Sequence, residues 1–248
     1  MITDGFSRDK AIIGPEDIYS PSQTRFRVCI CTFSPKILEE LLSLYSHTVA
    51  AYIGSVKGAV PVYAVRIDGR TFGAFSIGVG APVASADLID VNCLTGANTF
   101  VVFGSAGIIN NKAVDGRYVV PTAAYRDEGT SYHYAPPSDY IPIPGNRLTA
   151  KVFSDLGIPC VFGRTWTTDA FYRETEAKLK KRAEEGCLTV EMEMAALQAV
   201  CSFHGFTLLS FLHGGDVLDG EKYDHSGLHG ANHDLNKLSI AIEIAKRA

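Results

Sequence analysis

The sequence has no excess of basic residues and no long apolar run. Its 248 residues include 23 Lys and Arg against 27 Asp and Glu, for a net charge of −4. Nucleic acid and anionic membranes call for a basic surface, so neither is expected as a partner. No stretch reaches the length of a membrane span, and residues 1–10 lack the apolar run of a signal peptide. We therefore expect a cytoplasmic protein.

The spacings that bind metals are also missing. The six cysteines include no C-x-x-C pair, and most lie within apolar runs, which favours buried, reduced thiols. His225, His229 and His233 recur every four residues, as metal ligands on a helix do. Gly227 and Gly230 interrupt that helix, so no metal is predicted.

Apolar segments that suit strands alternate with amphipathic segments that suit helices along the whole chain. Strands are expected over 25–32, 62–67, 71–77, 99–103, 159–162, 187–190 and 206–212. Helices are expected from residue 35 and over 82–94, 147–156, 174–185, 194–204 and 232–247. This alternation predicts one α/β domain over residues 1–248, a three-layer αβα sandwich around a central mixed, largely parallel, twisted sheet.

Two of the predicted strands run into glycine-rich segments that suit ligand binding. In open α/β sheets, ligands gather beyond the carboxyl ends of the strands. The G-S-A-G sequence at 104–107 lets backbone N–H groups approach an anion, and Ser105 adds a hydroxyl. The H-G-G-D sequence at 213–216 presents Asp216, a candidate general acid. Each pattern alone is also typical of a simple turn.

A third predicted strand ends in two glutamates within an apolar stretch, V-E-M-E at 190–193. Buried carboxylates are costly unless they have partners, so Glu191 and Glu193 should have specific contacts. Glu193 also precedes a predicted helix, whose N-terminus favours an anion. A carboxylate fixed there can accept two hydrogen bonds from a vicinal diol such as ribose.

Together these patterns resemble the nucleoside phosphorylase superfamily, from about residue 28 to the C-terminus. V-E-M-E at 190–193 is similar to its ribose motif, and G-V-G-A-P at 78–82 is similar to its G-M-G-G-P loop. T-D-A-F-Y at 168–172 is similar to the segment whose aromatic residue stacks on the base. R-D-E-G-T-S-Y-H at 126–133 is similar to a segment of uridine phosphorylases.

The resemblance implies cleavage of the N-glycosidic bond of a nucleoside, with inorganic phosphate as co-substrate and no cofactor. The residues it implies are Glu191, Met192, Glu193 and Ser105 for ribose, Phe171 for the base, Asp216 as proton donor to purine N7, and Gly104, Ser105 and Lys36 for phosphate. Family members assemble as hexamers built from dimers, and a homo-oligomer is expected here too.

At three positions the sequence departs from the family's pattern of phosphate-binding arginines. The family's phosphate arginine after the first strand is missing from the Phe33–Ile37 stretch, Val102 replaces a second, and His47 stands near a third. Arginine forks bind phosphate best, so a rebuilt site with Lys36, His47 and Ser105 is one alternative. A nucleosidase that uses water is another, although no glutamate follows the first strand. A homologue that binds nucleosides without cleaving them is a third.

The base subsite favours purines. Asp216 lies where purine phosphorylases and nucleosidases of this family place their N7 donor, and Thr175 and Ala177 stand where uridine phosphorylases have a uracil-reading Gln and Arg. The 126–133 segment keeps a uridine phosphorylase as an alternative. Arg173 and Glu174, next to Phe171, either contact the base or form a surface pair, and the surface pair is the favoured interpretation.

Overall fold

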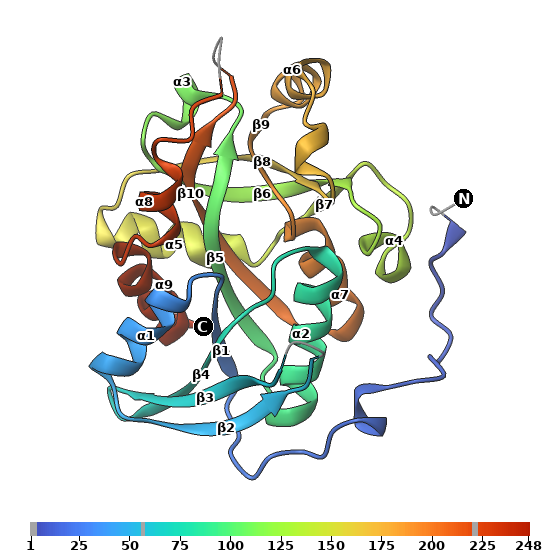
Figure 1. Cartoon of the computed structure of the whole chain (residues 1–248), viewed down its shortest axis with the longest axis vertical. Helices are drawn as coiled ribbons and strands as arrows, with labels where there is room; N and C mark the ends of the chain where they lie inside the picture. The colour runs from blue at the N-terminus through green and yellow to red at the C-terminus, as the bar shows by residue number, and fades with distance from the viewer. Residues whose placement is uncertain (1–3, 56–57, 220–222) are drawn as a thin grey trace.

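The computed structural model describes residues 4–55, 58–219 and 223–248, and within them ten strands form one mixed sheet (Figure 1). The strands are β1 (Val28–Thr32), β2 (His47–Ile53), β3 (Val60–Ile67), β4 (Arg70–Ser76), β5 (Thr99–Ile108), β6 (Tyr118–Asp127), β7 (Tyr140–Pro142), β8 (Cys160–Thr168), β9 (Cys187–Glu191) and β10 (Thr207–Val217). Their order is β10-β6-β8-β9-β5-β1-β4-β3-β2, with β7 paired to β6. A further pairing of β10 with β5 closes the first five strands of this order into a ring.

Parallel and antiparallel pairs are mixed in this sheet. β1 runs parallel to β4 and β5, and β5 runs parallel to β10. The hairpin of β3 and β4 is antiparallel, and its turn is formed by Asp68 (φ +48°) and Gly69 (φ +78°). An Asp-Gly pair is typical of such two-residue hairpin turns. The predicted central sheet is therefore confirmed as a mixed one.

Helices cover both faces of the sheet. They are α1 (Pro35–Leu44), α2 (Ala81–Thr95), α3 (Asn111–Val114), α4 (Ser131–Tyr134), α5 (Asn146–Leu156), α6 (Glu176–Glu184), α7 (Met194–His204), α8 (Leu228–Asn232) and α9 (Asn236–Arg247). α1, α5 and α9 pack into one core with Val28 and Ile30 of β1, whereas α2 and α7 pack into another with Cys29 and Cys31. Side chains alternate between the faces of a strand, so these two cores lie on opposite faces and form the αβα sandwich. No described helix has the length and apolar content of a membrane span.

Two predicted glycine-rich turns prove to be strand. Residues 104–107 belong to β5 and residues 213–216 belong to β10. The two strands pair in parallel from Thr99 and Thr207 as far as Ala106 and Gly214, and again, after a register shift, at Ile108 and Val217. This pairing keeps the backbone extended beyond the apolar runs. Ser105 and Asp216 are thus held by the sheet itself.

Candidate active site

A cavity of about 930 Å³ brings most of the predicted residues together. It lies where β1, β5 and β9 end, and α7 begins beside it. The predicted residues that line it are Gly104, Ser105, Phe171, Glu191, Met192, Glu193 and Asp216. The cavity therefore lies at the carboxyl ends of these strands, where open α/β sheets bind their ligands.

Two predicted residues lie elsewhere. Lys36 is exposed in the first turn of α1, because the next residues, Ile37 and Leu38, turn that helix's apolar side to the core. His47 is exposed at the start of β2, where its ring packs on Tyr63. Neither lines the cavity, so the rebuilt phosphate site expected from Lys36 and His47 is not formed there.

Glu191 is buried, and both of its carboxylate oxygens are engaged inside the protein. Oε1 accepts hydrogen bonds from the hydroxyls of Thr167 (2.6 Å) and Thr165 (3.3 Å). Oε2 accepts from the backbone N–H groups of Glu193 (2.7 Å) and Met194 (2.6 Å), where α7 begins. Burial raises the pKa of Glu191 to about 7, and these hydrogen bonds oppose that rise. Glu191 therefore fixes the junction of β9 and α7 and leaves no free oxygen for a ligand.

Glu193 is held differently from Glu191. We call Glu193, Met192 and Gly80 together the glutamate end of the cavity. Its Oε1 accepts from the Gly80 N–H (2.7 Å), and its Oε2 accepts from the Met192 N–H (3.3 Å). Gly80 has φ +97°, a conformation that favours glycine. Burial, followed by the charge of Glu191, raises the pKa of Glu193 to about 8. Each oxygen keeps a lone pair for a hydroxyl donor, as a diol requires.

A second part of the cavity, which we call the lysine end, consists of Ser34, Ser105, His233 and Lys237. The Ser34 hydroxyl lies 2.8 Å from His233 Nδ1, and the Ser105 hydroxyl donates to Asn232 Oδ1. These two contacts join the ends of β1 and β5 to the chain between α8 and α9. Both serines are placed to turn a hydroxyl toward a ligand.

Lys237 lies in the first turn of the amphipathic helix α9 and lines this cavity, yet it is only 1% exposed. Its Nζ donates to the backbone carbonyl of Ala231 and, at 3.5 Å, to that of Asn232. Within the described ranges no carboxylate lies within ion-pair distance of this Nζ. Burial lowers its pKa to about 8, while the charge of Asp234 opposes the shift. A buried ammonium without a counter-charge is costly, and an anion in the cavity would relieve that cost.

The aromatic end of the cavity consists of Phe171, Glu174, Asp216 and Tyr223. Phe171 is 50% exposed in a 3-10 turn, Phe171–Arg173, and its ring centroid lies 4.0 Å from that of Tyr172. Asp216 enters from β10, and the Tyr223 hydroxyl donates to it. Glu174 is half-buried and lines the cavity, whereas Arg173 is exposed. The interpretation of Arg173 and Glu174 as a surface pair is therefore wrong for Glu174.

The sequence interpretation did not include Ser34, His233, Lys237, Glu174 or Tyr223 among the cavity residues. For Lys237 a signal exists, because it precedes Ile240, Ala241 and Ile244 by three, four and seven residues, the spacing of the buried helix face. A lysine on an apolar stripe indicates a specific partner.

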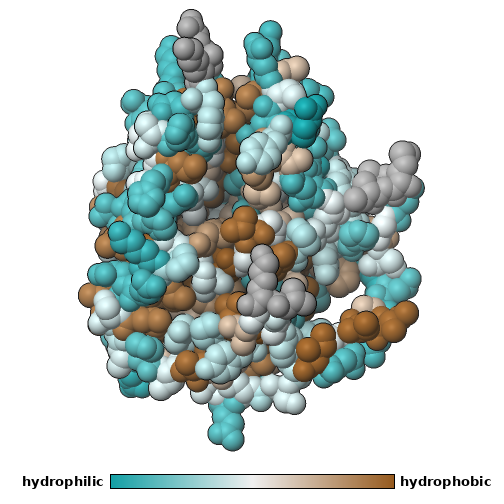
Figure 2. Space-filling model, in the orientation of Figure 1, coloured by the Kyte–Doolittle hydropathy of each residue, from teal (hydrophilic) through white to brown (hydrophobic). Residues whose placement is uncertain are grey.

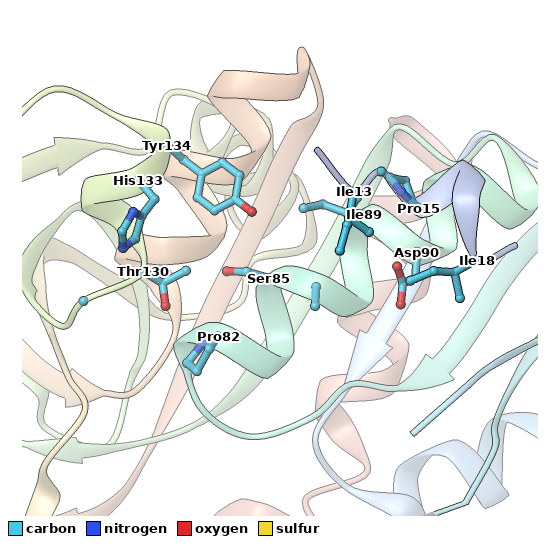
Figure 3. A pocket seen from close by; sticks show the side chains of 13 residues that line it. Ile13, Pro15, Ile18, Pro82, Ser85, Ile89, Asp90, Thr130, His133 and Tyr134 are labelled. Atoms are coloured by element: carbon cyan, nitrogen blue, oxygen red, sulfur yellow. The ribbon is translucent and has the colours of Figure 1, made fainter. Parts of the chain in front are cut away.

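A second hollow, of about 550 Å³, lies between the N-terminal segment, α2 and α4 (Figure 3). Ile13, Pro15 and Ile18 line one side, and Ser85 and Tyr134 are among the residues opposite. Ile12, Ile13 and Ile18 are all largely exposed, and Figure 2 shows hydrophobic atoms on this segment. The hollow brings together no convergent charges. Across the described part of the chain, no group of three or more His, Cys, Asp and Glu side chains is placed to hold a metal ion.

A cavity at the carboxyl ends of the strands of an αβα sandwich is the arrangement of α/β enzymes that act on small molecules. A sequence model of the phosphorylase superfamily matches residues 27–245, and the chain belongs to this superfamily. It is an enzyme of the nucleoside phosphorylase superfamily.

Similar proteins support this assignment. The chain is 28% identical over 158 residues to a DeoD-type purine nucleoside phosphorylase of Exiguobacterium sp., covering 62% of this chain and 67% of that one. It is 26% identical over 177 residues to the DeoD-type enzyme of Bacillus velezensis, covering 70% and 76%.

Two solved structures share the fold. The purine nucleoside phosphorylase of Toxoplasma gondii, in complex with immucillin-H, has a TM-score of 0.71 at 21% identity, covering 90% of this chain and 92% of that one. The futalosine hydrolase of Helicobacter pylori has a TM-score of 0.72 at 12% identity, covering 90% and 98%. At these identities the likeness concerns the fold, and a hydrolase shares it.

Proposed function

We propose that this enzyme cleaves the N-glycosidic bond of purine nucleosides with inorganic phosphate, releasing the free base and ribose 1-phosphate. The observation that carries the proposal is the buried ammonium of Lys237, which has no ion-pair partner among the described residues and lies beside the two serines, in the same cavity as Glu193 and Asp216. A phosphate dianion needs charge-assisted donors, and here a lysine from α9 would supply the charge that arginines supply elsewhere.

The three ends of the cavity divide the substrate between them. Glu193, with Met192 packed on the sugar, would accept hydrogen bonds from the ribose hydroxyls, and Phe171 would stack on the base. Asp216 would give a proton or a strong hydrogen bond to purine N7. Cleavage would pass through an oxocarbenium-like ribosyl cation, which a phosphate oxygen held at the lysine end captures at C1′.

The proposal also covers the choice of base, the compartment and the assembly of the enzyme. A purine is favoured over uridine by Asp216 and by the DeoD-type relatives. The chain would work without a cofactor, in the cytoplasm, as one domain and as a homo-oligomer such as a dimer-based hexamer. The continuous sheet supports a single domain, and the exposed isoleucines of the N-terminal segment are consistent with a subunit contact.

The deciding experiment measures base release from inosine, adenosine and uridine, each with and without phosphate. We expect purine release that requires phosphate and yields ribose 1-phosphate. Equal rates without phosphate would replace the proposal with a hydrolase, the activity named for the Helicobacter pylori structure. Binding of nucleoside without release of base would leave only a binding protein.

Lys237→Met tests the phosphate part directly. Because the variant keeps the length of the side chain and removes its charge, we expect the KM for phosphate to rise at least about tenfold, a loss of about 1.4 kcal/mol, with the KM for inosine little changed. Lys36→Met, an exposed lysine outside the cavity, is the matched control and should leave both values within about twofold. Equal values for Lys237→Met and the control would contradict the assignment.

A further inference from the structure

Two carboxyl groups, Glu174 and Asp216, reach the aromatic end of the cavity from separate elements. Glu174 follows the turn Phe171–Arg173 and donates its backbone N–H to the Phe171 carbonyl (3.2 Å), which fixes its place beside the exposed ring. Asp216 comes from β10, and its side chain lies near Gly107 of the adjacent strand β5. A Cβ at Gly107 would lie 3.5 Å from Asp216 Oδ1, so the carboxylate lies close above that strand. Both side chains line the cavity.

The two carboxyls differ in their partners. Asp216 accepts a hydrogen bond from the Tyr223 hydroxyl. The carboxyl of Glu174 has no hydrogen-bond or ion-pair partner among the described residues. Lys178, four residues further along the chain, is paired with Asp127 (3.0 Å). Glu174 is therefore a carboxyl that faces a cavity with nothing to bind to in the free protein.

Charge and burial determine which of the two holds a proton. Burial raises the pKa of Glu174 to about 7, the charge of Asp216 raises it further, and Lys178 opposes the shift. The charges of Asp216, Glu174 and Tyr172 also act on Tyr223, whose pKa is raised mainly by burial. Near neutral pH, Glu174 is thus protonated in about half of the molecules, the condition that suits a general acid best.

We propose that Glu174, rather than Asp216, is the general acid that protonates the leaving purine at N7, with Asp216 beside it at the base. The inference rests on the proposed function and reassigns its proton donor. The half-buried, unpartnered carboxyl in the cavity carries the proposal. Glu176, two residues further along and exposed at the start of α6, has no such position.

The step balances as follows. The C1′–N9 bond breaks and its electron pair goes to the purine, while the Glu174 proton moves to purine N7, so the base leaves neutral. An oxygen of HPO₄²⁻ forms the new bond to C1′. The proton that this phosphate loses restores the Glu174 carboxyl, so the enzyme returns to its initial state.

The test compares inosine with 7-methylguanosine, whose N7 is already alkylated and whose base leaves without a proton. At pH 6.5 with saturating phosphate, Glu174→Gln should lower kcat for inosine by about 10²-fold or more. Its kcat for 7-methylguanosine should stay within about threefold of the wild type. Glu176→Gln is the control and should leave both substrates unchanged. An equal loss for both substrates, or no loss for inosine, would overturn the proposal.

The pH profile gives a second readout that a structural role would not move. The wild-type kcat for inosine should fall as the pH rises through about 7, because Glu174 loses its proton. Asp216→Asn removes the neighbouring charge and should shift this limb to lower pH, whereas Glu174→Gln should abolish it. An unchanged limb in Glu174→Gln would overturn the assignment. If the wild type proves independent of phosphate, the proposed function fails, but the comparison of the two substrates still tests the acid.

Discussion

The glutamate end and the aromatic end of the cavity are built in different ways. At the glutamate end, Glu193 is 6% exposed, and the backbone N–H groups of Gly80 and Met192 bind its carboxylate. Beside it, Glu191 is 7% exposed and is bound by N–H groups where α7 begins. At the aromatic end, Phe171 is 50% exposed and Tyr172 is 88% exposed, on a single 3-10 turn. The glutamates are fixed by several elements, whereas the two exposed rings stand on one short turn.

This difference indicates how the enzyme divides its specificity. A rigid carboxylate, positioned by its neighbours, can align the sugar for attack at C1′, and such alignment supplies much of the rate of an enzyme. An open aromatic turn holds a base by stacking, which tolerates a change of base. We therefore expect substitutions of the two glutamates at the glutamate end and its junction to affect turnover or folding strongly, and substitutions of the aromatic rings at the other end to affect binding moderately.

The largest expected effect comes from Glu193→Ala. Removal of two charge-assisted hydrogen bonds to ribose should cost about 4 kcal/mol, so kcat/KM for inosine should fall by about 10³-fold. Steady-state kinetics measures this, with Glu184→Ala, an exposed glutamate, as control. A fall of less than about tenfold would mean that the sugar is held elsewhere.

The second largest effect is expected for Glu191→Ala, and it concerns the stability of the fold rather than catalysis. Glu191→Ala leaves two backbone N–H groups of the β9–α7 junction and the Thr167 hydroxyl without an acceptor. We expect the free energy of unfolding, measured by urea denaturation, to drop by about 3 kcal/mol. A drop below about 1 kcal/mol, similar to that of Glu184→Ala, would show that this junction is not fixed by Glu191.

The more rigid end was also the easier one to predict from the sequence. α7 begins and ends at Met194 and His204 as predicted, with Gly205 at φ +73°, and Ser34 caps α1 by accepting from the Ile37 N–H (3.3 Å). Capping residues and helix-terminal glycines act locally, so a single sequence contains the signal. β2 and β6 were not predicted. β2 has mostly exposed or half-buried residues, so hydrophobicity alone did not indicate it.

The cavity residues divide in the same way. Glu193, Met192, Phe171, Ser105 and Asp216 were found because they belong to short motifs next to strands or turns. Lys237 and Glu174 belong to no such motif. The spacing of Lys237 indicates the buried face of α9, but the cavity that either residue lines depends on how α9 and the Phe171–Arg173 turn pack against distant strands.

A third prediction concerns the pH dependence of stability. Burial raises the pKa of Glu193 to about 8, well above the value of an unfolded glutamate, about 4.3. The stability that the protonated form provides is present below about pH 4.3 and is lost as the pH rises through about 8. Glu193→Gln cannot ionise, so its free energy of unfolding relative to the wild type should rise by about 2 kcal/mol between pH 6 and 8. A difference that does not vary with pH would contradict the burial of this charge.

The smallest effect is expected at the aromatic end. Phe171→Ala should raise the KM for inosine about tenfold, or about 1.4 kcal/mol, because base–aromatic stacking contributes about 1–3 kcal/mol. Its thermal stability should change little, since half of the ring is already exposed. Tyr172→Ala is the matched control, because this ring packs on Phe171 but is 88% exposed, and its effect on KM should be below about threefold. If Tyr172→Ala had the larger effect, the base would stack on the outer ring. The tolerance for different bases would then come from the surface of the protein rather than from the cavity.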